Sequence, residues 1–491
     1  MHSIQTLIIT YINWYKINVG EKLYMRKAKE IYNWLQNHIE ITIAILSFLV
    51  ITLCSRNSFL YPANFECDIN VFQTIGRGML NGLVPYKDLF DHKGPYVYLL
   101  FMLLELWEPL VYILEIIVCA ISLCYAYKLI ELYEKNGLQI LIMFTCLSYF
   151  NLSFHSAGTV EEFFFPMELY ITYIGLRYIK EEKRIVPVQF FLIGIYAGLI
   201  LWSKYTILGF FVGWCIVPFV LMVRQKEYKE LVIGISLIIL GVVVITIPAG
   251  IYLGINEAIP DFIQAYFLNN IMYANKDGII VNIVSVIISF LLNRNMMPIM
   301  ILIAIGMVYI IKLNKIEKYY YLSTVLSMTL FTFAGGGFAY YSFTFNMFII
   351  FALLLIMKKW IGSAMAIVIT IFVIFHNQNF ELMHVNVKDT PQYKFAEIIN
   401  SVNEPTMLMY NSMDYGFYDI SNVMPNCKYF FRCSIAGLAE EERENYLKNK
   451  VVDFYICIDE PVEFKGYELI SEMNYGNKKK LNYYLYQLVE K

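Results

Sequence analysis

Charged residues are scarce in this chain of 491 residues, at 16% of the sequence against 58% hydrophobic residues. Soluble domains carry nearer to a quarter charged residues, because a surface in water needs them. The formal net charge of −2 also lacks the basic excess that attracts nucleic acid, so no nucleic-acid partner is expected. These shortages argue against both an ordinary soluble domain and a nucleic-acid-binding protein.

Several functional signatures are missing as well. The first apolar run, Leu7 to Ile12, is short, and its basic residues follow it, whereas a cleavable signal peptide carries them before its apolar run. The nine cysteines show no metal-binding spacing; Cys427 and Cys433 either pair outside the cell or remain free thiols. There is no internal repeat of the kind found in many transporters, and no Gly-rich loop for a nucleotide phosphate.

What the sequence does contain is a series of long apolar blocks, each near the roughly 20 residues that cross a membrane as a helix. The expected spans are 39–55, 95–130 (one long or two short), 138–154, 163–179, 188–203, 205–223, 231–254, 296–312, 319–334, 340–357 and 361–376. The fold class predicted is therefore a polytopic α-helical membrane protein with about 11 to 13 transmembrane helices.

Short basic loops predict the orientation of these spans, because loops rich in Lys and Arg stay in the cytoplasm. They are Lys180–Arg184, Arg224–Lys229, Lys312–Lys318 and Lys358–Lys359. Residues 1–37 then form a basic cytoplasmic arm, while segments 56–94 and 255–295 lie outside. The short apolar stretch 281–292 fits an interfacial or re-entrant helix better than a full crossing.

Three domains are expected: the arm 1–37, a membrane domain over 38–376 and an outer domain over 377–491. The outer domain has short β-prone runs at 406–410, 429–432, 452–458 and 482–487, and a charged helical pattern at 438–448. Strands that alternate with a helix predict a small α/β domain.

The first outer loop, 56–94, concentrates ionisable residues. It holds Glu66, Asp68, Arg77, Lys87, Asp88, Asp91, His92 and Lys93. Residues 68–81 predict an amphipathic helix that lies on the membrane with Asp68 at its start, since Ile69, Phe72, Ile75 and Met79 recur on one face. One explanation is that an outer loop is polar because it faces water. The other is that charges of both signs, clustered among aromatic residues, form a site that binds an anionic headgroup and holds a carboxylate base.

This loop also carries a family resemblance. After Asp68 come Gly76-Arg77-Gly78-Met79-Leu80-Asn81-Gly82 and then Pro85-Tyr86-Lys87-Asp88-Leu89-Phe90-Asp91-His92-Lys93-Gly94-Pro95. The pattern resembles membrane glycosyltransferases of the GT-C type, in particular the bacterial relatives of protein mannosyltransferases and of the lipid A aminoarabinose transferase. The resemblance covers roughly residues 40–376 and says nothing of the sugar.

The resemblance implies roles for individual residues. Asp68 matches the family's catalytic base on the acceptor hydroxyl, and Lys93 matches the lysine that faces the carrier phosphate. In some relatives an acidic residue before that lysine helps to hold a divalent metal; here the position is His92, so a metal role stays open and no cofactor is certain.

Further positions match the family more weakly. Glu161 or Glu162 resembles a second acidic position, for which Glu66, Asp88 and Asp91 are further candidates. Lys204, Arg77, Tyr340 and Tyr341 are candidates for binding the donor phosphate or sugar, although Tyr340 and Tyr341 also suit an interfacial aromatic belt. His155 is a candidate metal ligand or a structural histidine, and Asn269, Asn270 and Tyr273 are candidate sugar contacts.

The function expected from the resemblance is an inverting glycosyltransferase in the plasma membrane. It would move a sugar from a polyprenyl-phosphate carrier to an acceptor hydroxyl on a glycan, lipid or protein at the outer face. Two alternatives stay open: a polysaccharide polymerase or ligase of the O-antigen type, and a lipid or sugar transporter. The charged loop comes first in the chain, whereas such polymerases place their large loop late, and the charges gather at the outer interface rather than at mid-membrane.

Overall fold

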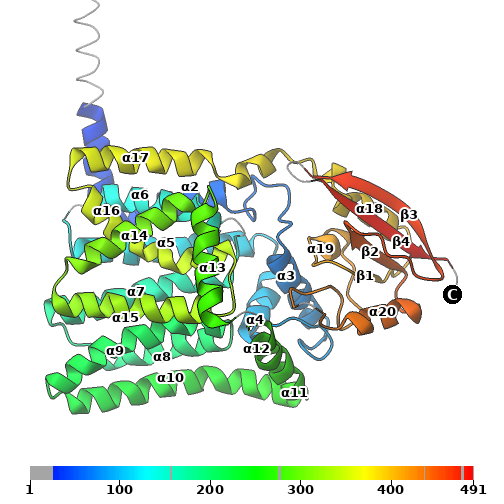
Figure 1. Ribbon diagram of the computed structural model, residues 1–491, viewed down its shortest axis with the longest axis horizontal. Helices are drawn as coiled ribbons and strands as arrows, with labels where there is room; N and C mark the ends of the chain where they lie inside the picture. The colour runs from blue at the N-terminus through cyan, green and yellow to red at the C-terminus, as the bar shows by residue number, and fades with distance from the viewer. Residues whose placement is uncertain are drawn as a thin grey trace, which may run out of the picture.

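The computed structural model describes residues 26–135, 137–154, 157–274, 278–435, 437–476 and 480–489. Helices dominate the described part, and a small sheet lies near the C-terminus. Long helices run side by side in a bundle, and the C-terminal domain sits at one end of it, next to α3 (Figure 1). The first loop therefore lies between the bundle and the C-terminal domain.

The bundle helices follow the predicted apolar segments closely. They are α2 (Ile39–Cys54), α4 (Pro95–Leu104), α5 (Leu110–Glu131), α6 (Leu138–Tyr149), α7 (Val160–Glu181), α8 (Pro187–Leu201), α9 (Gly209–Arg224), α10 (Tyr228–Ile255), α14 (Met297–Ile311), α15 (Lys315–Phe333), α16 (Met347–Ile356) and α17 (Trp360–Phe375). Region 95–130 forms two helices, because Glu105, Glu108 and Pro109 interrupt the apolar run and proline cannot continue a helix.

Five of the described helices are long and apolar enough to cross a membrane, or up to seven if each of two bent pairs is one span. These helices are compatible with a multi-pass membrane protein. Helices α4, α6 and α8 are apolar but shorter than a full span. The larger count of about 11 to 13 spans therefore stays a prediction.

The two bent pairs lie at opposite ends of the bundle. A helix over Arg26–Asn37 meets α2 at 101°, so this part of the predicted basic arm turns away from the bundle axis. Helix α13 (Ile279–Leu292) meets α14 at 116° and runs across the end of the bundle that faces the C-terminal domain (Figure 1). This geometry agrees with the interfacial or re-entrant helix predicted over 281–292.

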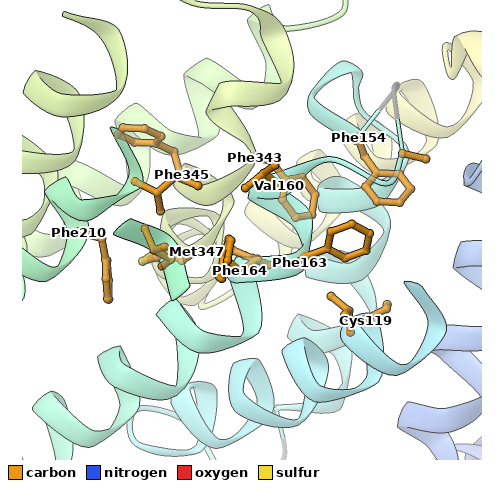
Figure 2. Packing of buried hydrophobic residues seen from close by; sticks show 14 of the residues in the cluster. Cys119, Phe154, Val160, Phe163, Phe164, Phe210, Phe343, Phe345 and Met347 are labelled. Carbon is orange, nitrogen blue, oxygen red and sulfur yellow. The ribbon is translucent and has the colours of Figure 1, made fainter. Parts of the chain in front are cut away.

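A core of aromatic side chains joins the start of α7 to the 3-10 helix η4 (Ala339–Asn346). Phe163 and Phe164 lie near Phe343 and Phe345 in Figure 2, and the ring of Phe343 lies 4.9 Å from that of Phe165. Because Glu161 precedes this core in α7 and Tyr341 precedes it in η4, the packing brings both residues to the same end of the bundle.

The loop helix α3 (Cys67–Leu80) confirms the predicted amphipathic segment. Ile69, Phe72 and Ile75 are buried, and α3 packs against α4. Asp68 is the second residue of the helix, as the pattern predicts. The second loop adds three short helices, α11 (Ile259–Phe262), η3 (Ile263–Leu268) and α12 (Asn269–Ala274).

The C-terminal domain contains a mixed four-stranded sheet in the order β1-β2-β4-β3. The strands are β1 (Met407–Met409), β2 (Phe454–Ile458), β3 (Tyr467–Tyr475) and β4 (Leu481–Leu488), with helices α18 (Pro391–Ile399), α19 (Phe417–Ser421) and α20 (Glu440–Lys448). Strand β2 pairs in parallel with β1 and antiparallel to β4. The predicted strands at 406–410, 452–458 and 482–487 and the helix at 438–448 are confirmed.

One prediction for this domain is wrong, and one strand was not predicted. Residues 429–432 form no strand, and a single backbone hydrogen bond from Met409 N to Phe430 O ties them to β1. Strand β3 escapes the pattern because it lies at the sheet edge, where charged residues such as Glu468 and Glu472 face solvent. Cys427 and Cys433 do not pair with each other; both are free thiols, which is the second of the two alternatives left open by the sequence.

Candidate functional site

A cavity of about 440 Å³ opens where the end of the helical bundle meets the first loop and the C-terminal domain. Seven residues of the predicted site line it: Glu66, Asp68, His92, Lys93, Lys204, Tyr340 and Tyr341. They come from the first loop, from the turn after α8 and from η4, which are far apart in the sequence. The fold thus gathers both predicted lysines and the predicted base around one space.

Asp68 is held at the start of α3, where the positive end of the helix dipole favours a carboxylate. Its Oδ2 accepts a hydrogen bond of 2.8 Å from the Tyr340 hydroxyl. Burial alone would raise the pKa of Asp68, but Lys93, the Tyr340 hydrogen bond and Lys204 outweigh it and lower that pKa. The carboxylate is therefore ionised at neutral pH.

Lys93 is buried, with 7% of its surface exposed, and its backbone is fixed on both sides. Its N–H donates to the Tyr98 hydroxyl at 3.0 Å, and its carbonyl accepts from the Tyr86 hydroxyl at 2.8 Å. Burial alone would lower the pKa of the ammonium, but Asp68 and Asp91 together raise it. Lys93 is thus a permanent cation on the cavity wall.

Gly94 explains why the two lysines meet. The Gly94 N–H donates to the Ser203 carbonyl at 2.9 Å, and a Cβ on Gly94 would lie 2.1 Å from the Trp202 carbonyl oxygen. Only glycine lets the first loop approach the end of α8 this closely. The contact sets Lys93 and Lys204, each next to one of the touching residues, beside the same cavity.

Replacing Gly94 with alanine is expected to destabilise the protein by about 1 to 3 kcal/mol, the usual cost of overpacking a tight contact. Thermal unfolding of the purified protein in detergent measures this as a lower midpoint. Gly250→Ala is the matched control, because a Cβ there meets nothing within 4 Å. A wild-type midpoint for Gly94→Ala would contradict the role of this contact.

Lys204 is bound on several sides. Its ammonium pairs with Glu161 and lies 3.5 Å from the centre of the Tyr341 ring and 5.1 Å from that of Tyr340. Burial lowers its pKa, and the Glu161 carboxylate opposes this. The pair with Glu161 and the aromatic faces hold the cation in position at the cavity wall.

His92 lies between cationic and anionic neighbours. Its Nε2 is 3.4 Å from Lys93 Nζ, and its Nδ1 is 3.4 Å from Asp91 Oδ1. Burial and the Lys93 cation lower the pKa of His92 to about 4, so the ring is neutral near pH 7. In the described part of the chain no group of three or more His, Cys, Asp or Glu side chains could hold a metal. The side chains around His92 therefore do not fit a divalent ion, and an ammonium beside its Nε2 opposes one.

Other predicted site residues do not line this cavity. Arg77 instead donates to the Tyr418 carbonyl at 3.1 Å and lies 3.4 Å from Asp419, which ties α3 to the C-terminal domain. Asp88 accepts from Val84 N in a loop turn, and Asp91 accepts from the Tyr98 hydroxyl. These contacts give Arg77, Asp88 and Asp91 partners away from the cavity, so their assignment to phosphate binding and to a second acidic site stays a prediction.

Of the remaining candidates, some line the cavity and others lie away from it. Glu66 lines the cavity and lies 3.4 Å from Arg56. Glu162 accepts from Gly158 N at 2.8 Å within the bundle and does not reach the cavity. Asn270 lines the cavity and donates to the His92 carbonyl, whereas Asn269 bonds to Gln264. His155 and the side chain of Tyr273 lie outside the described residues.

Sequence reasoning missed part of the wall. Tyr205 and Thr206 follow Lys204 directly, so their position next to a candidate residue was a usable signal. Met413, Tyr415 and Ser434 come from the C-terminal domain and carry no sequence pattern of a site. Their position depends entirely on how that domain docks.

A second cavity of about 450 Å³ adjoins the first and is almost entirely apolar. It lies among α4, α5, α7 and α8, with wall residues such as Val97, Leu103, Ile117 and Phe164, and Ser203 lines both cavities. Leu103 and Ile117 are 50% and 49% exposed, so this groove borders the apolar outer surface of the bundle. A polar site and an apolar groove thus share a wall.

No protein-family model matches this chain, and no curated protein matches it either. The resemblance to glycosyltransferases of the GT-C type therefore stays an expectation from the sequence, and it is strongest in the first loop.

Proposed function

We propose that this protein is an inverting glycosyltransferase that transfers a sugar from a polyprenyl-phosphate carrier to an acceptor hydroxyl. The observation that carries the proposal is one cavity with an ionised carboxylate, Asp68, and two buried cations, Lys93 and Lys204. The adjoining apolar groove supports a lipid-linked donor, because it offers an isoprenoid chain an apolar surface beside the cations. In this proposal the protein lies in the plasma membrane, with the cavity and the C-terminal domain at the outer face.

Sugar transfer from this donor needs one base for the acceptor hydroxyl and cations that contact the departing phosphate. The acceptor oxygen forms a bond to the anomeric carbon as the bond from that carbon to the phosphate oxygen breaks, and the configuration inverts. Asp68 takes the hydroxyl proton, and polyprenyl phosphate leaves with the bonding electron pair. Lys93 and Lys204 stabilise the charge that develops on the departing phosphate. Polyprenyl phosphate is a good leaving group, so no covalent nucleophile is required.

Transfer from a panel of radiolabelled polyprenyl-phosphate sugars in purified membranes tests this proposal. We expect one donor to be consumed, with a product of inverted anomeric configuration by NMR. If vesicles move the donor across the membrane without cleaving it, the transporter alternative replaces the proposal. If the product is a lengthened polymer built from lipid-linked oligosaccharides, the polymerase alternative replaces it.

The pH dependence of kcat/KM is expected to be level between about pH 6 and 8, because kcat/KM reports groups of the free enzyme. The pKa of Asp68 is lowered below its usual value, so its active ionised form persists and is lost only in acid. His92, with a pKa of about 4, stays neutral over the same range. His92→Gln should leave the profile level, and an inflection near pH 6.5 that this variant removes would contradict the assignment.

A further inference from the structure

The C-terminal domain supplies one wall of the candidate site. Met413, Tyr415 and Ser434 line the cavity opposite the membrane helices. Tyr415 is 38% exposed and lines the cavity. The domain is thus part of the site rather than an appendage to the bundle.

The loop that carries Tyr415 is held firmly. Asp414 Oδ1 accepts from Gly416 N at 3.1 Å and from Phe417 N at 2.8 Å, and Gln392 Nε2 donates to the Tyr415 carbonyl at 2.9 Å. Gly416 has a φ of +90°, where glycine is favoured. A Cβ on Gly416 would lie 2.9 Å from the Phe65 ring, so this loop packs directly on the residues before α3.

Contacts away from the cavity fix the domain as a whole. Arg77 bonds to the Tyr418 carbonyl, and Phe90 N donates to the Lys428 carbonyl at 2.9 Å. The Lys428 ammonium pairs with Asp261 of the second loop at 2.6 Å. Both outer loops therefore hold the domain, and Tyr415 keeps a defined position relative to Asp68.

The charges that act on Tyr415 differ from those that act on Asp68. Lys93 and Lys204 lower the pKa of Asp68, whereas the charged side chains that act on Tyr415, on its side of the cavity, are the carboxylates Glu66 and Asp68. Burial and the neighbouring Cys67 and Glu66 raise the pKa of Tyr415 to about 12, so its hydroxyl remains a hydrogen-bond donor. An anionic acceptor would be repelled on this side, while a neutral one would not.

We infer that Tyr415, with Met413 and Ser434, forms the acceptor subsite and binds a neutral saccharide. A sugar ring offers an apolar face of C–H groups to the aromatic ring and hydroxyls to the Ser434 and Tyr415 oxygens. The site would place one of these hydroxyls next to Asp68. This inference rests on the proposed function and adds the class of acceptor to it.

The test separates acceptor binding from donor chemistry in the full-length protein in lipid nanodiscs. The donor is the polyprenyl-phosphate sugar consumed in membranes, and the acceptor probes are short neutral oligomers of glucose, galactose and N-acetylglucosamine. Tyr415→Ala is expected to raise the KM of the saccharide by about tenfold, the effect of losing a stacked aromatic contact. The slow hydrolysis of the donor by water should stay at its wild-type rate.

Two variants control this measurement. Tyr446→Ala makes the same change in the C-terminal domain but outside the cavity, and should leave the saccharide KM unchanged. Tyr415→Phe keeps the ring and should retain most of the binding. A wild-type saccharide KM in Tyr415→Ala, or an equal loss of transfer and donor hydrolysis, would overturn the subsite.

The remaining outcomes distinguish a failure of the acceptor assignment from a failure of the proposed function. A wild-type protein that hydrolyses the donor but glycosylates none of the saccharides refutes the saccharide assignment and leaves the proposed function in place. A wild-type protein that neither hydrolyses nor transfers any donor of the panel refutes both.

Discussion

Replacing Asp68 with asparagine is expected to lower kcat by about 100-fold or more, the contribution of a general base in positioned proton transfer. Asparagine keeps the shape of the side chain, and its carbonyl oxygen can still accept the hydrogen bond from Tyr340. What it loses is the ability to take the acceptor proton. Initial rates of sugar transfer at saturating donor measure the effect.

Neighbouring carboxylates serve as controls for this result. Asp88 lies in the same loop but outside the cavity, and its role as an acceptor from Val84 N survives in Asp88→Asn, so wild-type rates are expected. Glu66 lines the cavity beside Asp68 and is the rival base. If Glu66→Gln abolishes transfer while Asp68→Asn retains it, the base is Glu66 and the assignment of Asp68 is wrong.

Replacing Lys93 with methionine is expected to lower kcat by about 100-fold or more, as when a preorganised donor to a developing oxyanion is lost. Methionine matches the unbranched shape of lysine but carries no charge. The change also removes the main cation that lowers the pKa of Asp68. The acid limb of the pH profile should therefore move to higher pH, because the pKa of Asp68 rises when this cation is lost.

Lys87→Met is the matched control for the lysine. Lys87 lies in the same loop, half-exposed and 3.9 Å from Glu257, and does not line the cavity. Its replacement should change the rate less than twofold, because an exposed ion pair contributes little free energy. Lys93→Arg, which keeps the charge, should restore part of the activity. Equal losses in the Lys87 and Lys93 variants would point to a general effect of loop charge instead of a phosphate contact.

Local patterns in the sequence predicted much of the fold. Apolar blocks predicted the helices of the bundle, and the spacing of Ile69, Phe72 and Ile75 predicted α3, because hydrophobic periodicity reports on the face that an element buries. The same reasoning failed for β3, whose polar residues reflect its position at a sheet edge. It also left the number of full spans open, since α4 and α8 are short apolar helices that length alone does not classify.

For the site, the sequence by itself determined which residues are chemically exceptional: Asp68, Lys93 and Lys204 are ionisable in a chain poor in charge. Only the tertiary structure decided which of them share a space. The contact of Gly94 with Trp202 sets the two lysines beside one cavity, and the core around Phe343 brings η4 to the bundle end where Tyr340 reaches Asp68.

The structure also places Arg77, a phosphate-binding candidate from the sequence, away from the cavity, and it places Tyr415, for which the sequence carries no signal, on the cavity wall. Both outcomes follow from the docking of the C-terminal domain on α3. The physical reason is that composition and periodicity are local properties, whereas a cavity is built by close packing between segments that are hundreds of residues apart.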